Sequence, residues 1–196
     1  MLPPPPTTVG ALESFPTRPV PDDYPYARIH DQWKEPEWFC SDGGCRFDPP
    51  PGEPFGTCYV AGNPLGAFVE RFGRLKAVPR RLVDQKVLSN LQLPSPVMVA
   101  DATNRQLVGD FGLTAELWAG DDYEGSQRWA AALYRAGFAG IWYPCRHDVQ
   151  GDLHALAMFG KPGFQPAQML ATSEPQPIPT TLLDRAELEF GIQIIE

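Results

Sequence analysis

Residues 43–72 read GGCRFDPPPGEPFGTCYVAGNPLGAFVERF, and this stretch decides the fold because it joins a loop, a strand and a helix. Residues 48–52 contain three consecutive prolines, which fix φ and lack an N–H donor, so this part is expected to be a loop. The apolar run 58–60 predicts a short buried strand. The Asn-Pro pair at 63–64 predicts the start of a helix, and Gly73 predicts its end.

The predicted helix has one apolar face, because its apolar residues recur at spacings of three and four. The residues on this face are Leu65, Phe68, Val69 and Phe72. Glu70 lies off the face and is expected either in a cleft beside the sheet or in water. An i,i+4 pair with Arg74 in water would contribute only about 0.2–0.5 kcal/mol, and the sequence alone favours that ordinary role.

Arg46 and Tyr59 also have ordinary structural roles open to them. An arginine in a loop commonly covers apolar surface with its aliphatic stem. A tyrosine in an apolar strand is commonly a core residue whose hydroxyl finds a partner. Taken singly, these residue types therefore do not identify a site.

Composition limits the choice of protein class. The chain has 196 residues, which is enough for one well-filled core, and it carries a net charge of −8. That charge argues against broad contact with nucleic acid, so no direct nucleic-acid partner is expected. The first ten residues, MLPPPPTTVG, contain no basic region or apolar run, so neither a signal peptide nor a membrane span is expected.

The cysteines and histidines predict neither a disulfide framework nor a metal site. The four cysteines, at 40, 45, 58 and 145, lack the close Cys-x-x-Cys pairs of a zinc site, and the three histidines show no ligand spacing. Reduced thiols and a cytoplasmic location are therefore expected. No metal ligand is predicted.

The pattern along the chain predicts one α+β domain with a mixed or antiparallel sheet and flanking helices. Residues 1–23 are rich in proline and are expected to be an extended or disordered arm; residues 24–160 form the domain, and residues 161–196 add a proline-rich loop, a helix and a strand packed on the same domain. Further strands are predicted over 87–93, 97–100, 140–143, 154–159 and 192–195, and further helices over 123–136 and from Thr180 or Thr181 to 189.

Six blocks of the sequence, in order, resemble those of the RES domain family, which is named for Arg, Glu and Ser residues. They are YARI (26–29), GCRFDP (44–49), CYVA (58–61), AFVE (67–70), YEGSQRWA (123–130) and GFAGIWYPCR (137–146). The resemblance spans most of residues 24–160. It implies a fold like that of the ADP-ribosyltransferases.

The resemblance also implies a function. Members of the family include toxins of toxin–antitoxin pairs, and the implied activity is degradation of NAD by cleavage of the nicotinamide–ribose bond. NAD is then the substrate rather than a cofactor, water or inorganic phosphate is the candidate acceptor, and a helix-turn-helix (Xre-like) antitoxin is the expected partner. A protein ADP-ribosyltransferase and a non-catalytic nucleotide-binding module remain as alternatives, since the same residues would serve each of them.

By resemblance, three kinds of side chain receive roles in the site. Arg28 and Arg46 would clamp the phosphates through their paired planar donors. Glu70 would stabilise the oxocarbenium-like transition state or orient the ribose hydroxyls. Tyr59 would offer a flat face to the nicotinamide or its ribose.

The sequence departs from the family at the position of the serine. Pro144-Cys145 stands where relatives have Pro-Ser, and a thiol is a weaker hydrogen-bond donor than a hydroxyl. Ser126 is the candidate to supply the same contact, although a polar residue in the first turns of a helix needs no such role. His30, two residues after Arg28, could line the same cleft.

Overall fold

A mixed sheet organises the molecule, whose computed structural model describes residues 2–196. In spatial order its strands are β1 (Thr17–Val20), β7 (Val97–Asp101), β8 (Gly140–Pro144), β9 (His154–Gly160), β4 (Gly56–Ala61), β2 (Tyr26–Asp31), β6 (Lys86–Gln92) and β11 (Leu170–Ala171), with β12 (Gln176–Pro177) also paired to β6. β7 and β8 run parallel, and the other neighbouring pairs run antiparallel. The predicted fold class, one α+β domain with a mixed sheet and flanking helices, is therefore confirmed.

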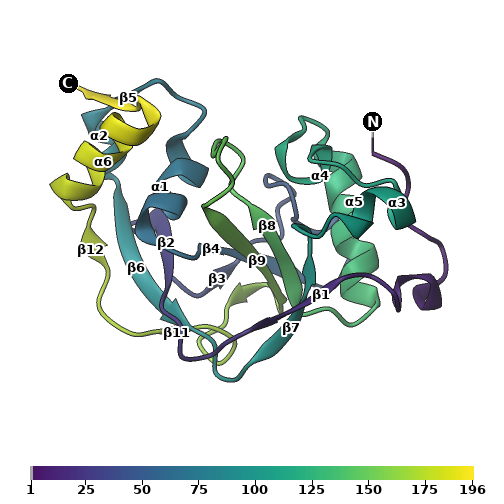
Figure 1. Ribbon diagram of the computed structural model, residues 1–196. Helices are drawn as coiled ribbons and strands as arrows, with labels where there is room; N and C mark the ends of the chain where they lie inside the picture. Colours follow the sequence, from purple (N-terminus) through teal and green to yellow (C-terminus); the bar gives the residue numbers. More distant parts are fainter. Residues whose placement is uncertain (1) are drawn as a thin grey trace.

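The helices gather at two sides of this sheet (Figure 1). One group contains α1 (Pro64–Phe72), α2 (Arg80–Asp84) and α6 (Thr180–Phe190), and the other contains α3 (Gln106–Phe111), α4 (Glu116–Ala119) and α5 (Tyr123–Arg135). The short η1 (Val9–Leu12) is a 3-10 helix. Two small strand pairs complete the fold: β3 (Trp38–Phe39) with β10 (Gly163–Phe164), and β5 (Ala77–Pro79) with β13 (Gln193–Ile195).

Helix α1 begins and ends where the sequence predicts. The side chain of Asn63 accepts a hydrogen bond from Gly66 N at 2.8 Å, and Pro64 occupies the first turn, where its missing N–H costs nothing. Gly73 follows the last helical residue. The predicted apolar face is buried, which directs the opposite side of the helix, including Glu70, away from the core.

The sheet is weakest between β2 and β4. β2 pairs with β6 along its whole length and β4 pairs with β9 along its whole length, whereas the ladder between β2 and β4 contains only the pair Ala27 and Ala61. We call this junction the seam. Because the two strands separate on leaving it, side chains from both can face a common space.

Two hydrophobic clusters cover the two faces of the sheet. The larger one packs the helices on the sheet and includes Phe68, Trp129 and Ile141. The smaller one, on the other face, includes Cys58 and Val60 of β4. Alternation along β4 therefore sends Tyr59 toward the helices.

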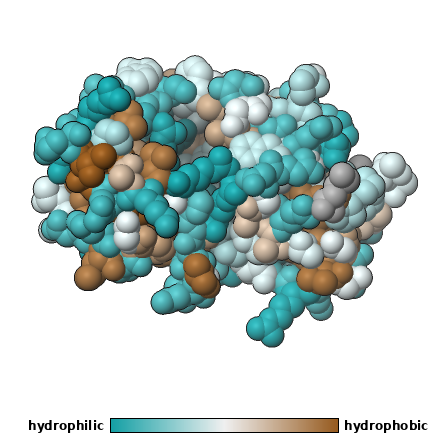
Figure 2. All heavy atoms as spheres, turned by 90° about the horizontal axis from the view of Figure 1, so that it is seen from above, coloured by the Kyte–Doolittle hydropathy of each residue, from teal (hydrophilic) through white to brown (hydrophobic). Residues whose placement is uncertain are grey.

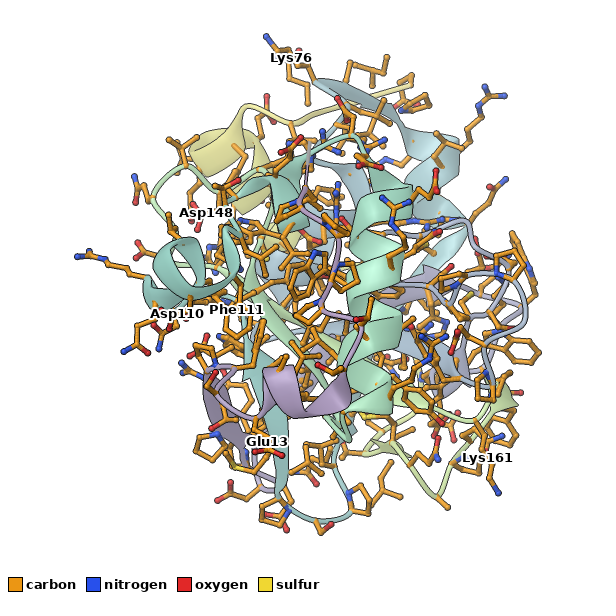
Figure 3. The ribbon with its side chains drawn as sticks, turned by 90° about the vertical axis from the view of Figure 1, so that its right-hand side faces the viewer. Glu13, Lys76, Asp110, Phe111, Asp148 and Lys161 are labelled. Carbon is orange, nitrogen blue, oxygen red and sulfur yellow. The ribbon has the colours of Figure 1, made fainter. Side chains whose placement is uncertain are left out.

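The N-terminal segment differs from the expected extended or disordered arm. Strand β1 forms an edge of the sheet, and Leu2, Leu12 and Phe15 are buried in the larger cluster. The segment runs beside α5 (Figure 3), where Trp129 Nε1 donates to Pro3 O at 2.8 Å. Its prolines are compatible with this packing because an edge strand tolerates residues without an N–H donor.

The C-terminal residues follow the prediction closely. The predicted helix and strand correspond to α6 and β13, with Gly191 adopting a left-handed φ of 66° directly after the helix. α6 begins at Thr180, but no side-chain hydrogen bond caps it. The expected proline-rich loop adds β11 and β12 to the outer side of β6.

Candidate functional site

A cavity of about 360 Å³ opens at the seam. Its walls come from β2, β4, α1, the loop at 40–46, the end of β8 with the two residues 146–147, and the first residue of α5. Seen from above, hydrophilic side chains gather across the middle of the molecule, between the parts that carry α1 and α5 (Figure 2). Arg28, Arg46, Tyr59 and Glu70, four of the five predicted site residues, line the cavity, as does His30.

Glu70 points into the cavity and is held there by two donors. The backbone N–H of Arg146 donates to Glu70 Oε1 at 2.7 Å, and the hydroxyl of Tyr143 donates to Oε2 at 3.2 Å. The ordinary role as a surface partner of Arg74 is not observed, because Arg74 Nη2 donates instead to the hydroxyl of Tyr123 at 2.6 Å. Glu70 is thus a positioned carboxylate in a cleft.

Burial raises the pKa of Glu70 above its ordinary value of 4.5. The hydrogen bonds from Arg146 and Tyr143 and the positive charges of Arg46 and Arg146 oppose this shift. Burial thus favours the neutral acid, whereas the hydrogen bonds and the two arginines favour the carboxylate.

Arg46 enters the cavity from the loop before β4. The residue is 8% exposed: Nη1 donates to Gly120 O at 2.6 Å, and Cζ lies 4.6 Å from the centre of the Tyr123 ring. Burial lowers the pKa of Arg46, while the charge of Glu70 acts in the opposite direction. The cation therefore lies near Glu70 and can attract an anionic part of a ligand.

Tyr59 has a polar role in addition to its predicted flat face. Its hydroxyl donates to Asp48 Oδ1 and accepts from Phe47 N, each at 2.9 Å, while Asp48 Oδ2 accepts from Cys45 N at 2.9 Å. These bonds connect the two chain neighbours of Arg46, Cys45 and Phe47, to Tyr59 of β4, Cys45 through Asp48. Burial raises the pKa of Tyr59 well above its ordinary value, so the hydroxyl stays protonated as a donor.

Arg28 lines the cavity at the seam, but its surroundings differ from those of Arg46. Arg28 Nη1 donates to Pro36 O at 2.6 Å, to Trp38 O at 2.9 Å and to the Cys58 thiol at 2.7 Å. The two arginines share no hydrogen-bond partner within residues 2–196, although both line the same cavity. Arg28 anchors the segment that leads into β3.

Ser126 does not line the cavity, in contrast to the sequence expectation. Its side chain is fully buried in α5, and its hydroxyl donates to Leu117 O at 2.8 Å and lies 3.2 Å from Asp122 O. It joins α4 to α5 and has no free face for a ligand.

The departure at Cys145 also lies outside the cavity. The thiol is buried, and its Sγ lies 3.9 Å from Gly66 O at the start of α1. Burial raises the pKa of Cys145, so the group stays a neutral thiol. A hydroxyl at this position would face α1 and not the cavity.

Sequence reasoning missed four residues that shape the site: Asp48, Tyr123, Tyr143 and Arg146. Each lies inside one of the quoted sequence blocks, and alternation along the strand 140–143 could have assigned Tyr143 and Ile141 to the same face. For Tyr143 and Arg146 the signal was insufficient because their partner Glu70 is more than seventy residues away in the chain.

Residues 2–196 contain neither a candidate metal site nor a candidate membrane span. No group of three or more His, Cys, Asp and Glu side chains in this part of the chain could hold a metal ion. No helix among the same residues is long and apolar enough to cross a bilayer.

Comparison with known proteins places this architecture in a family. A chain of the crystal structure of the M. tuberculosis MbcT–MbcA toxin–antitoxin complex superimposes with a TM-score of 0.66 at 17% sequence identity, covering 90% of this chain and 94% of that one. No curated protein matches the sequence. The family model of the RES domain matches residues 18–180, most of the chain. This protein therefore belongs to the RES domain family.

Proposed function

We propose that this protein degrades NAD by cleaving the bond between nicotinamide and ribose, and that it acts as the toxin of a toxin–antitoxin pair. The observation that carries the proposal is the cavity at the seam, in which a positioned carboxylate, Glu70, lies near the buried cation of Arg46. Family membership supports the same assignment.

The chemistry suits these side chains. Nicotinamide leaves NAD as a neutral group, so positive charge develops on the ribose as the bond breaks. An ionised Glu70 stabilises that charge, as carboxylates do in glycoside cleavage. Because Tyr143 and Arg146 already orient the carboxylate, little reorganisation is needed when the charge appears.

Binding of NAD would use the cationic side chains of the cavity. Arg46 reaches the cavity from the loop at 40–46, where it can face an anionic group of the ligand. Arg28 lies at the seam, and its Nη1 donates to two backbone carbonyls. We assign the pyrophosphate to the Arg46 side and leave Arg28 the role of shaping the wall. The ring of Tyr59 borders the same space.

The partner and the location follow from the family assignment. The solved structure with the similar fold is described as a toxin–antitoxin complex. We propose by analogy that an antitoxin of the helix-turn-helix type blocks this cavity, and that both proteins act in the cytoplasm.

One assay tests the proposal. The purified full chain is incubated with NAD, with and without inorganic phosphate, and the products are resolved. Phosphate-dependent loss of NAD identifies phosphorolysis, phosphate-independent loss identifies hydrolysis, and label transferred to protein identifies an ADP-ribosyltransferase. Binding of NAD with no product would leave the non-catalytic module and overturn the proposal.

A further inference from the structure

The cavity is basic although the chain as a whole is acidic. Six of the 16 Lys and Arg residues line it, against three of the 24 Asp and Glu residues. Two of the six, Arg46 and Arg146, act on the charge of Glu70, and Arg74 lies with Arg46 at the ring of Tyr123. Such an enrichment in a concave space attracts anions.

Tyr123 holds two of these arginines together. Arg46 Cζ lies 4.6 Å and Arg74 Cζ lies 5.6 Å from the centre of its ring, and the Tyr123 hydroxyl accepts a hydrogen bond from Arg74. The ring offsets the cost of bringing two like charges together. Two guanidinium groups are thereby kept beside the cavity.

The guanidinium of Arg146 has a hydrogen-bond partner on one terminal nitrogen and, in the described part of the chain, none on the other. Its Nη2 donates to Asp121 Oδ1 at 2.7 Å, but Nη1 is buried and has no hydrogen-bond partner among residues 2–196. Asp121 is exposed to solvent, and its hydrogen bond with Arg146 lowers the pKa of Asp121. An exposed surface carboxylate thus occupies one edge of a guanidinium whose other edge has no acceptor in the chain from residue 2 onward.

We infer that Arg46, Arg74 and Arg146 form an oxyanion subsite beside Glu70, and that a phosphate group enters it by displacing Asp121 from Arg146. Arginine is suited to this exchange because its planar fork binds a tetrahedral oxyanion through two donors at once, whereas Asp121 engages one. Nη1, which has no partner within the described residues, is a second donor available to the incoming ligand. The identity of the phosphate as part of NAD or as a free co-substrate rests on the proposed function, but the subsite itself does not.

Calorimetric titration of the full chain with inorganic phosphate tests the subsite without any turnover. Replacement of Arg146 by Gln is expected to weaken phosphate binding by about tenfold or more, since a charge-assisted bond is lost. Asp121→Asn is expected to strengthen it by several-fold, because the competing charge is removed. Arg128→Gln is the matched control: Arg128 is exposed on α5, pairs with Glu124 and does not line the cavity.

A second titration distinguishes the two sources of phosphate. ADP-ribose is titrated in the absence and in the presence of saturating inorganic phosphate. Loss of ADP-ribose affinity means that the nucleotide's pyrophosphate occupies the subsite, and unchanged affinity means that free phosphate binds beside the nucleotide. Either result supports the subsite if Arg146→Gln weakens the binding of the phosphate that occupies it.

The inference is overturned if wild type binds neither inorganic phosphate nor ADP-ribose, or if Arg146→Gln binds both as tightly as wild type. If Arg146→Gln does not fold, the exposed Asp121→Asn decides, and unchanged affinity for both probes overturns the inference. Failure of the proposed function looks different: NAD would persist with the wild-type protein while phosphate binding still depended on Arg146.

Discussion

The hydroxyl of Tyr59 donates a hydrogen bond to the buried carboxylate of Asp48, 2.9 Å away, and this pair fixes the loop that presents Arg46. Burial raises the pKa of Asp48, and the bonds from Cys45 N and Tyr59 oppose that shift. The contact connects β4 to a loop that lacks regular structure. The position of the Arg46 cation therefore depends on a strand residue thirteen positions later in the chain.

Tyr59→Phe removes both hydrogen bonds of this hydroxyl while keeping the ring. We expect the KM for NAD to rise with a smaller change in kcat, because Arg46 is less well positioned for binding. The free energy of unfolding should fall by about 1–3 kcal/mol, since Asp48 loses a buried partner. Tyr134→Phe, whose ring stacks on Phe55 outside the cavity, is the control. An unchanged KM in Tyr59→Phe would mean that the loop holds Arg46 without this bond.

Glu70→Gln keeps the shape of the side chain and removes its charge. Turnover of NAD should fall by at least about 100-fold, because the stabilisation of positive charge on the ribose is lost. NAD binding, measured by calorimetry, should change little. Glu124→Gln, on an exposed carboxylate of α5, should keep wild-type activity. Full activity in Glu70→Gln would refute the role assigned to this carboxylate.

The pH dependence of kcat should report the protonation of Glu70. Because burial raises its pKa, activity should be lost on acidification at a pH higher than the ordinary value of 4.5. Tyr143→Phe removes a hydrogen bond that lowers this pKa, so the acidic limb should move to still higher pH. An acidic limb at the same pH in both proteins would show that another group controls it.

The same shift predicts how stability varies with pH. A raised pKa means that the folded chain retains the proton of Glu70 to higher pH than the unfolded chain does. Its contribution to the free energy of unfolding is therefore greatest below 4.5 and is lost as the pH rises through the raised pKa. The difference in stability between wild type and Glu70→Gln should change with pH in that window, as measured by urea unfolding. A constant difference from pH 4 to pH 8, about the range that the shift concerns, would contradict the raised pKa.

Ser126→Ala tests whether this residue has a role beyond packing. Its hydroxyl serves Leu117 O in the interior, so the free energy of unfolding should fall by about 1–2 kcal/mol while KM and kcat for NAD stay close to wild type. A large loss of activity in a variant that keeps its thermal stability would return Ser126 to the site.

Local signals in the sequence predict the elements well. The Asn63 cap and the apolar spacing define α1, and Gly191 defines the end of α6. What the sequence could not predict was which polar side chains meet. The environment of Glu70 depends on two residues of the distant β8 end, and the buried hydroxyl of Ser126 depends on α4, an element too short to leave a periodic pattern.

The N-terminal segment shows that composition alone can mislead a prediction from sequence. Its prolines suggest an unfolded arm when composition is considered alone. Pro19 in fact lies in the edge strand β1, opposite Met98, where a missing donor is tolerated. The apolar residues that anchor the segment, Leu2, Leu12 and Phe15, are too widely spaced to form a recognisable pattern.

The seam at Ala27 and Ala61 has a consequence for the mechanics of the molecule. Two half-sheets meet at one residue pair, and the cavity lies across that junction. A ligand bound there would contact both half-sheets and hold them together. Occupancy would then stiffen the whole domain, and the slowed exchange of amide hydrogens would extend from the cavity walls along both half-sheets.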